Sequence, residues 1–173
     1  MKKIDFFLIG APKCGTDSLR KYLDNSVDIF MCGPQEPNYF CRDIQPPTYE
    51  PDVHISKNFG KAPKNKFWGE KSTWYLTSKT APMACKKHNK EALFIAIVRD
   101  QMSMFISLHA ELRKLGVEPI ADPEEAWDFS FQRNPDDLKG NARFLHYPSA
   151  CALGEQILYW QNVVGVENLL VTN

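Results

Sequence analysis

The sequence has no excess of charge of either sign. Its 173 residues include 21 lysines and arginines and 21 aspartates and glutamates, so the formal net charge is zero. A protein without a general basic field does not attract nucleic acid over long distances, and any affinity for anions must come from a local group of residues. We therefore expect no nucleic-acid partner.

Cysteines are few, and no two of them form a CxxC pair. The five cysteines are Cys14, Cys32, Cys41, Cys85 and Cys151. An odd number leaves one thiol over in any full set of disulfides, and zinc sites usually contain closely spaced pairs. No set of histidine, aspartate and glutamate has metal-ligand spacing either. We therefore expect reduced thiols, a cytoplasmic protein and no metal site.

Long hydrophobic runs are also lacking. The first two lysines precede an apolar run, as in a signal peptide, but Asp5 interrupts the segment and only residues 6–9 continue it. A signal peptide needs about 7–15 apolar residues, and a membrane-spanning helix needs about 18 or more. The sequence therefore predicts no insertion into a membrane.

Strand and helix patterns alternate along the chain. Such alternation predicts an α/β fold with three layers and a central parallel sheet, and the nearly continuous apolar character of 4–9 places that strand at the centre. The expected strands are 4–9, 92–98 and 168–172, and the expected helices are 16–24, 78–89, 102–115, 122–131 and 154–164. For the first helix, Asp17 or Ser18 is a candidate N-cap.

Two segments show no regular pattern. Residues 31–66 hold six of the 12 prolines, so we expect a long irregular insertion of the kind that forms a substrate wall or a lid. Within it, His54 and Phe59 are expected to pack at the surface. Residues 133–150 are expected to form a second loop, with Arg133 and Tyr147 on the solvated surface.

The segment GAPKCGTDSL, residues 10–19, lies between the first expected strand and the first expected helix. Glycines let the backbone approach an anion, a helix N-terminus offers unpaired N–H groups, and a lysine adds a full positive charge. The segment therefore predicts a phosphate or sulfate loop made of Pro12, Lys13, Cys14, Gly15, Thr16, Asp17 and Ser18. A Walker A loop would have a lysine where Thr16 stands, which disfavours a kinase or NTPase. Cys14 is expected to be a small filler of the loop.

Pro-Lys-x-Gly-Thr after a first strand resembles the 5′-phosphosulfate loop of sulfotransferases that use 3′-phosphoadenosine 5′-phosphosulfate (PAPS). Further along, IAIVRD at 95–100 is followed by FISLH at 105–109. In the family, an arginine and a serine at the spacing of Arg99 and Ser107 hold the 3′-phosphate. An arginine supplies a charge-assisted bond and a serine adds a directional donor, which suits that role.

Two more segments support the resemblance. QEPNYF at 35–40 is similar to the Lys-Glu-x-x-Phe-Phe motif of glycan and bacterial sulfotransferases, where the glutamate is the proposed general base. Neighbouring prolines and aromatic residues would partly desolvate Glu36, which favours proton abstraction. WGEKSTWYL at 68–76 is similar to the Glu-Lys-Ser/Thr-Pro-x-Tyr-Leu motif, with Thr73 in place of the proline. The resemblance places Lys71 near the sulfonate or the acceptor.

The resemblance implies a P-loop-NTPase-like sulfotransferase fold over 1–173, with PAPS as donor, adenosine 3′,5′-bisphosphate (PAP) as product and no metal. A sulfuryl group would move to a hydroxyl or amine of an acceptor, and the Glu36 motif favours a glycan. The family's adenine-stacking residue is replaced by Ser18, so the candidates for base recognition are Trp74 and the C-terminal portion that we expect the chain to lack. Implied catalytic residues are Glu36, Lys13 and Lys71, and implied cofactor-binding residues are Pro12, Lys13, Cys14, Gly15, Thr16, Asp17, Ser18, Arg99 and Ser107.

Three questions stay open at this point. The family domain usually continues beyond the strand at 169–172, so we expect a single domain that lacks its C-terminal portion. A nucleotide or small-molecule kinase with a variant P-loop, acting with ATP and Mg²⁺, is one alternative function. A non-catalytic module that binds PAPS or PAP is another.

Overall fold

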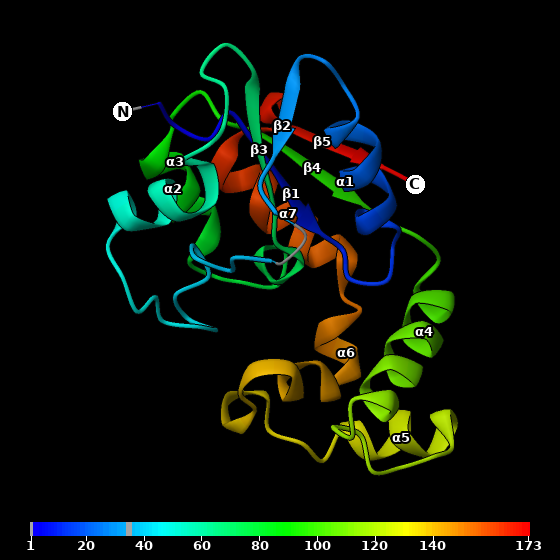
Figure 1. Cartoon of the computed structure of the whole chain (residues 1–173). Coiled ribbons are helices and arrows are strands. Elements are labelled where there is room, and N and C mark those ends of the chain that lie inside the picture. Colours follow the sequence, from blue (N-terminus) through cyan, green and yellow to red (C-terminus); the bar gives the residue numbers. More distant parts are fainter. Residues whose placement is uncertain (1, 34–35) are drawn as a thin grey trace.

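Five parallel strands form the central layer of the protein. A computed structural model describes residues 2–33 and 36–173. The strand order is β2-β3-β1-β4-β5 (Figure 1). The strands are β1 (Phe6–Gly10), β2 (Ile29–Met31), β3 (Phe67–Lys71), β4 (Leu93–Ile97) and β5 (Leu169–Thr172). Strand β1 is buried along its whole length and lies at the centre, as its apolar sequence predicts. Gln35 of the Glu36 motif lies outside the described residues.

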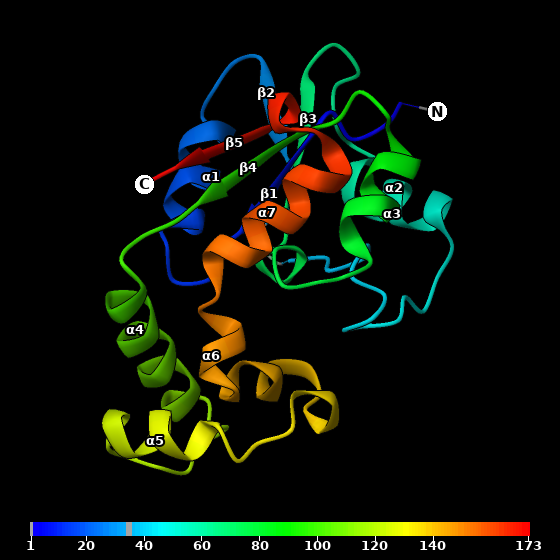
Figure 2. The ribbon, with the colours of Figure 1, turned by 180° about the vertical axis from the view of Figure 1, so that it is seen from behind.

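Helices cover both faces of the sheet and complete the three layers (Figures 1 and 2). Helix α1 (Thr16–Asp24) lies on one face, and α3 (Ala81–His88) and α7 (Leu153–Val164) lie on the other. On the α7 face, Phe94 stacks on Phe7 with ring centroids 5.7 Å apart and meets Trp160 at 5.2 Å. The expected α/β fold with a central parallel sheet is therefore confirmed. Among the described residues, no helix is long and apolar enough to cross a membrane.

The segment 31–66 differs from the expectation of an irregular insertion. It contains α2 (Pro51–Phe59), which begins with a proline at a position where helices tolerate one, and strands β2 and β3 flank it. His54 and Phe59 are buried instead of lying at the surface. His54 Nε2 lies 2.7 Å from Glu70 Oε2, and Phe59 stacks on Trp68 with ring centroids 5.1 Å apart. Their partners are on β3, outside the segment, so its composition alone gave the wrong prediction.

A smaller lobe extends from the carboxyl edge of the sheet (Figures 1 and 2). It is built from α4 (Gln101–Lys114), α5 (Pro123–Ser130), α6 (Tyr147–Ala150) and the 3₁₀ helices Pro135–Asp137 and Gly140–Leu145. Aspartates cap its two longest helices: Asp100 accepts from Ser103 N, and Asp122 accepts from Glu125 N. This lobe stands opposite the loop that follows β1.

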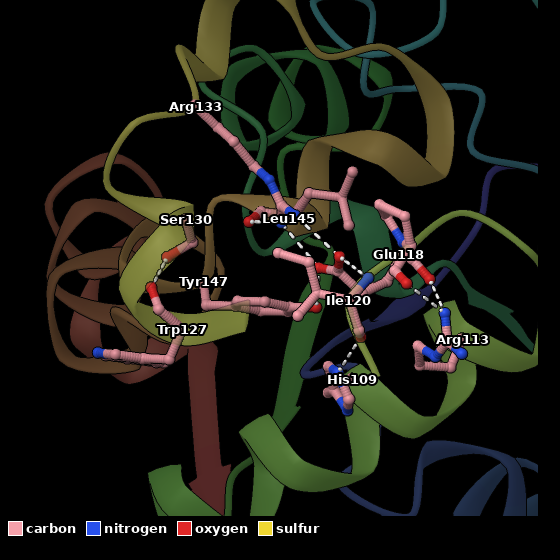
Figure 3. Close-up of polar contacts among 10 residues, drawn as sticks. His109, Arg113, Glu118, Ile120, Trp127, Ser130, Arg133, Leu145 and Tyr147 are labelled. Carbon is pink, nitrogen blue, oxygen red and sulfur yellow. Dashed lines mark hydrogen bonds and ion pairs between the residues drawn. The ribbon is translucent and has the colours of Figure 1, made fainter. Parts of the chain in front are cut away.

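A buried carboxylate holds the lobe together (Figure 3). Arg133 donates two hydrogen bonds of 2.8 Å to the two oxygens of Glu118, and Tyr147 donates a third, also 2.8 Å. Arg133 also donates to Leu145 O at 2.8 Å. The prediction that Arg133 and Tyr147 lie on the solvated surface is therefore wrong: they are the partners of an otherwise unpaired buried charge. The network fixes the 3₁₀ helix Gly140–Leu145, which forms one wall of the site.

Candidate functional site

The loop between β1 and α1 presents a bare helix N-terminus. Gly15 occupies the N-cap position with φ of 89°, in the left-handed region that favours glycine, and no side chain caps the helix. Asp17 and Ser18 lie inside the first turn, so the expected N-cap was wrong. The first N–H groups of α1 lack partners within the helix and lie at its partially positive end. This arrangement suits an anion.

Lys13 and Cys14 are neighbours in the loop, but the side chain of Lys13 is partly exposed and that of Cys14 is buried. Lys13 adopts the left-handed region with φ of 62°, which is uncommon for a residue with a side chain. Its Nζ pairs with Glu111 of α4, and its carbonyl accepts a bond of 3.1 Å from Arg99. Cys14 is buried, and burial raises the pKa of its thiol although Arg99 acts against this shift. Cys14 therefore fills the loop, as expected, while Lys13 faces the space between sheet and lobe.

Lys71, the last residue of β3, joins two carboxylates. Its Nζ lies 2.5 Å from Asp17 Oδ1 and 2.9 Å from Glu36 Oε1, and only 4% of its side chain is exposed. Burial acts to lower the pKa of Lys71, but the two carboxylates outweigh it and the pKa is raised. The same hydrogen bond lowers the pKa of Asp17. Lys71 and Asp17 are therefore both charged at neutral pH.

Glu36 is held from two sides. Besides Lys71 on Oε1, Oε2 accepts hydrogen bonds from the backbone N of Thr73 at 2.9 Å and from its hydroxyl at 2.8 Å. Three donors surround this carboxylate, whose side chain is 22% exposed and so partly shielded from water. A proline at position 73, as in the family motif, has neither donor. The departure at Thr73 therefore gives the carboxylate two additional hydrogen bonds.

Two adjoining cavities meet at these side chains. The first, about 330 Å³, is lined by Pro12, Lys13 and residues 15–17 of the loop together with Ser107 of α4. The second, about 250 Å³, is lined by Asn38, Trp74 and Phe144, among others. Both cavities share Pro12, Lys13, Glu36, Thr73 and Glu111. These shared side chains therefore separate the loop-lined cavity from the second cavity.

The structure brings most of the expected site residues together. Pro12, Lys13, Gly15, Thr16, Asp17, Glu36 and Ser107 line the first cavity, and Lys71 lies behind Asp17 and Glu36. Arg99 is exposed beside the loop, and Cys14 and Ser18 are not among the described lining residues. Trp74 lines the second cavity and not the first. No three described His, Cys, Asp or Glu side chains are grouped as metal ligands.

Glu111 is the site residue that the sequence reading missed. It lies one turn after Ser107 on α4, and residues four apart share one face of a helix. The position of Ser107 in the expected helix 102–115 was the signal that could have identified Glu111.

Comparison with known proteins supports the fold. No family model matches the sequence, and neither does any curated protein. Among solved structures, the sulfotransferase from Alicyclobacillus acidocaldarius superposes with a TM-score of 0.81 over 99% of this chain and 73% of that chain, at 20% sequence identity. The chain has a sulfotransferase fold. Within this fold, the loop after β1, Glu36 and Lys71 lie together at the carboxyl edge of the sheet, where open α/β sheets bind ligands.

Proposed function

We propose that this protein is a sulfotransferase that moves a sulfuryl group from PAPS to a hydroxyl or amine of an acceptor. The observation that carries the proposal is the position of Glu36. Its carboxylate is oriented by Lys71 and Thr73 at the boundary between the loop-lined cavity and the second cavity. A general base must lie within reach of an acceptor proton on one side and the reacting group on the other.

The first cavity provides what a donor of this kind needs. PAPS supplies an activated sulfuryl group attached to a phosphate. The uncapped N-terminus of α1 and the ammonium of Lys13 would hold the phosphosulfate. Ser107 lines the same cavity and Arg99 lies beside the loop, so we assign these two residues to the 3′-phosphate.

The two lysines have different tasks in the proposed reaction. Lys13 lies in the loop and would neutralise the charge that develops on the leaving phosphate oxygen. Lys71, fixed between Asp17 and Glu36, would keep the base oriented toward the second cavity. Preorganised donors of this type are each worth about 2.7–4 kcal/mol of transition-state stabilisation.

We further propose a cytoplasmic location. The five cysteines are all free and buried, which supports a reducing compartment.

Calorimetric titration with PAP, AMP and Mg-ATP tests the proposal. We expect PAP to bind at least about tenfold more tightly than AMP, because Arg99 and Ser107 recognise the additional phosphate. The double variant Lys13→Ala, Arg99→Ala should lose this preference. Lys90→Ala, an exposed lysine just before β4 at the opposite edge of the sheet, should bind as the wild type does.

Other outcomes point to other functions. A preference for Mg-ATP over PAP would replace the proposal with a kinase. Tight PAP binding without transfer of labelled sulfate from PAPS to any acceptor would indicate a binding module. An absence of binding to all three nucleotides would overturn the proposal.

A further inference from the structure

The second cavity has one apolar wall and one strongly polar wall. Its apolar side is formed by Trp74, Phe144 and leucines of α4, with the Trp74 and Phe144 rings 6.1 Å apart in an edge-to-face arrangement. Its polar side includes Glu36, Glu111 and Asn38. A volume of about 250 Å³ is just below the usual range of ligand pockets, so the cavity encloses about one ring of its occupant.

The polar wall accepts hydrogen bonds more than it donates them. An ionised carboxylate, such as that of Glu36 or Glu111, can accept hydrogen bonds but cannot donate them. Asn38 adopts a left-handed backbone with φ of 52°, and its Oδ1 is buried with no hydrogen-bond partner among the described residues. A ligand that donates a hydrogen bond to such a buried polar atom binds more favourably, because it removes the cost of an unsatisfied acceptor. The wall therefore matches a ligand that carries several hydroxyl or ammonium groups.

Lys13 is the only cation among the described residues lining this cavity, and Glu111 already pairs with it. A bound phosphosulfate in the first cavity would compete with Glu111 for the same ammonium. The side chain of Glu111 is 43% exposed, so its carboxylate has room to turn toward the second cavity. Once Lys13 is engaged by the donor, Glu111 becomes an unpaired negative charge on the cavity wall, which repels anions and attracts donors.

We propose that the second cavity is the acceptor subsite and takes one neutral or cationic sugar ring, with Glu111 accepting a hydrogen bond from a sugar hydroxyl. The inference rests on the proposed sulfotransferase function and deepens it. A sugar fits because one face of its ring is apolar and packs on aromatic side chains, while its hydroxyls supply several donors. A phenol has only one donor for the three acceptors, and a uronic acid or sulfated sugar would bring a second negative charge to Glu111.

Because Glu111 would exchange Lys13 for the acceptor, its charge should weaken donor binding and strengthen acceptor binding. Glu111 competes with the donor for Lys13, so removing its charge should strengthen donor binding. Glu111 also receives the acceptor, so the same change should weaken acceptor binding. A residue with a merely structural role would not affect the two ligands in opposite directions.

The first arm of the test is calorimetric titration of the full chain with PAP. We expect Glu111→Gln to bind PAP about two- to fivefold more tightly than the wild type, the range for a partly exposed ion pair. Glu91→Gln is the matched control, because Glu91 is exposed just before β4, at the edge of the sheet opposite the site. An unchanged or weaker affinity in Glu111→Gln would overturn the inference.

The second arm uses ligand-observed NMR at saturating PAP with three sugars of one ring type: methyl glucoside, glucosamine and glucuronate. Wild type and Glu91→Gln should bind the first two and reject glucuronate. Glu111→Gln should bind methyl glucoside about tenfold more weakly and lose the discrimination against glucuronate.

The outcomes separate the two proposals. Tight PAP binding with no sugar bound, or with glucuronate bound by the wild type as well as methyl glucoside, would overturn the inference and leave the donor assignment standing. A wild type that does not bind PAP would overturn the proposed function itself, and the acceptor subsite with it.

Discussion

Both lysines of the site pair with carboxylates, and they differ in exposure. Lys71 is 4% exposed and lies between Asp17 and Glu36, whereas Lys13 is 31% exposed and pairs, among the described residues, with Glu111 alone. An exposed single pair is weak and can exchange partners, while a buried cation with two partners is held in place. Lys13 therefore suits contact with a ligand that binds and leaves, and Lys71 suits a fixed position beside the base.

Two substitutions, one at Glu36 and one at Thr73, test whether Glu36 acts as the general base, because they should lower kcat by different amounts. We expect Glu36→Gln to lower kcat about 10²–10⁴-fold, because an amide cannot take the acceptor proton. Thr73→Val removes the hydroxyl donor and keeps the N–H donor, so kcat should fall only about tenfold. Steady-state kinetics with labelled PAPS measures both effects.

PAP binding provides the control for these two variants. Thr73→Val should bind PAP with wild-type affinity within about twofold, and Glu36→Gln should bind PAP at least as tightly as the wild type, because neither removes a positive charge from the loop. An equal loss of kcat in Thr73→Val and Glu36→Gln would contradict the role of Glu36 as base, since the hydroxyl only positions it.

Lys13, Glu36 and Ser107 could be predicted because each belongs to a contiguous motif. Their partners could not, because they are distant in sequence: Glu111 lies 98 positions from Lys13, and Lys71 lies 54 positions from Asp17. Asp17 shows the consequence most clearly. A carboxylate in an anion loop is unfavourable when only neighbouring residues are considered, and only the buried ammonium of Lys71 accounts for it.

At the scale of elements, the strands that sequence patterns missed are short and depend on their neighbours. Strand β2 has three residues, and β3 contains a glycine, which weakens strand propensity. Gly69 is nevertheless required by packing, because a Cβ there would overlap the Phe6 ring and the Met31 sulfur. By contrast, α1 matches its predicted range 16–24, because its boundaries are set by local glycine and helix signals.

Gly69→Ala tests this close approach. We expect a loss of about 1–3 kcal/mol in the free energy of unfolding, because the buried side chains of Phe6 and Met31 must move to admit one methyl group. Gly154→Ala in the first turn of α7 is the matched control. A Cβ at Gly154 meets no atom within 4 Å, so the same change should be neutral or stabilise by up to about 1 kcal/mol. Urea unfolding measures both values, and equal effects at the two glycines would show that packing at Gly69 is not tight.

At the scale of the whole molecule, the site lies where the sheet and the smaller lobe face each other. The alternation of strands and helices predicted the sheet, but the lobe depends on Glu118, whose carboxylate is 0% exposed and whose partners lie 15 and 29 positions away. No local pattern marks such a network. Because Arg133 also holds Leu145, the network positions Phe144 and therefore the wall of the second cavity. The stability of the lobe and the shape of the second cavity are thus coupled.

Glu118→Gln tests through pH how much this network contributes to stability. Burial acts to raise the pKa of Glu118, but the bonds from Arg133, the Ile120 N–H and Tyr147 outweigh it and lower the pKa below the ordinary value of 4.5. A group with a lowered folded pKa contributes stability that is fully present above its unfolded pKa and is lost as pH falls through the folded value.

At pH 7, Glu118→Gln should therefore lower the free energy of unfolding by about 3–5 kcal/mol, because it leaves Arg133 buried without a carboxylate. Below about pH 4.5 the difference between wild type and variant should shrink, because protonation removes the same charge from the wild type. Urea unfolding from pH 7 to pH 3 measures this difference, with Glu91→Gln as the exposed control that parallels the wild type. A difference independent of pH would mean that the ionised form of Glu118 does not stabilise the lobe, since shape and packing are nearly the same in glutamate and glutamine.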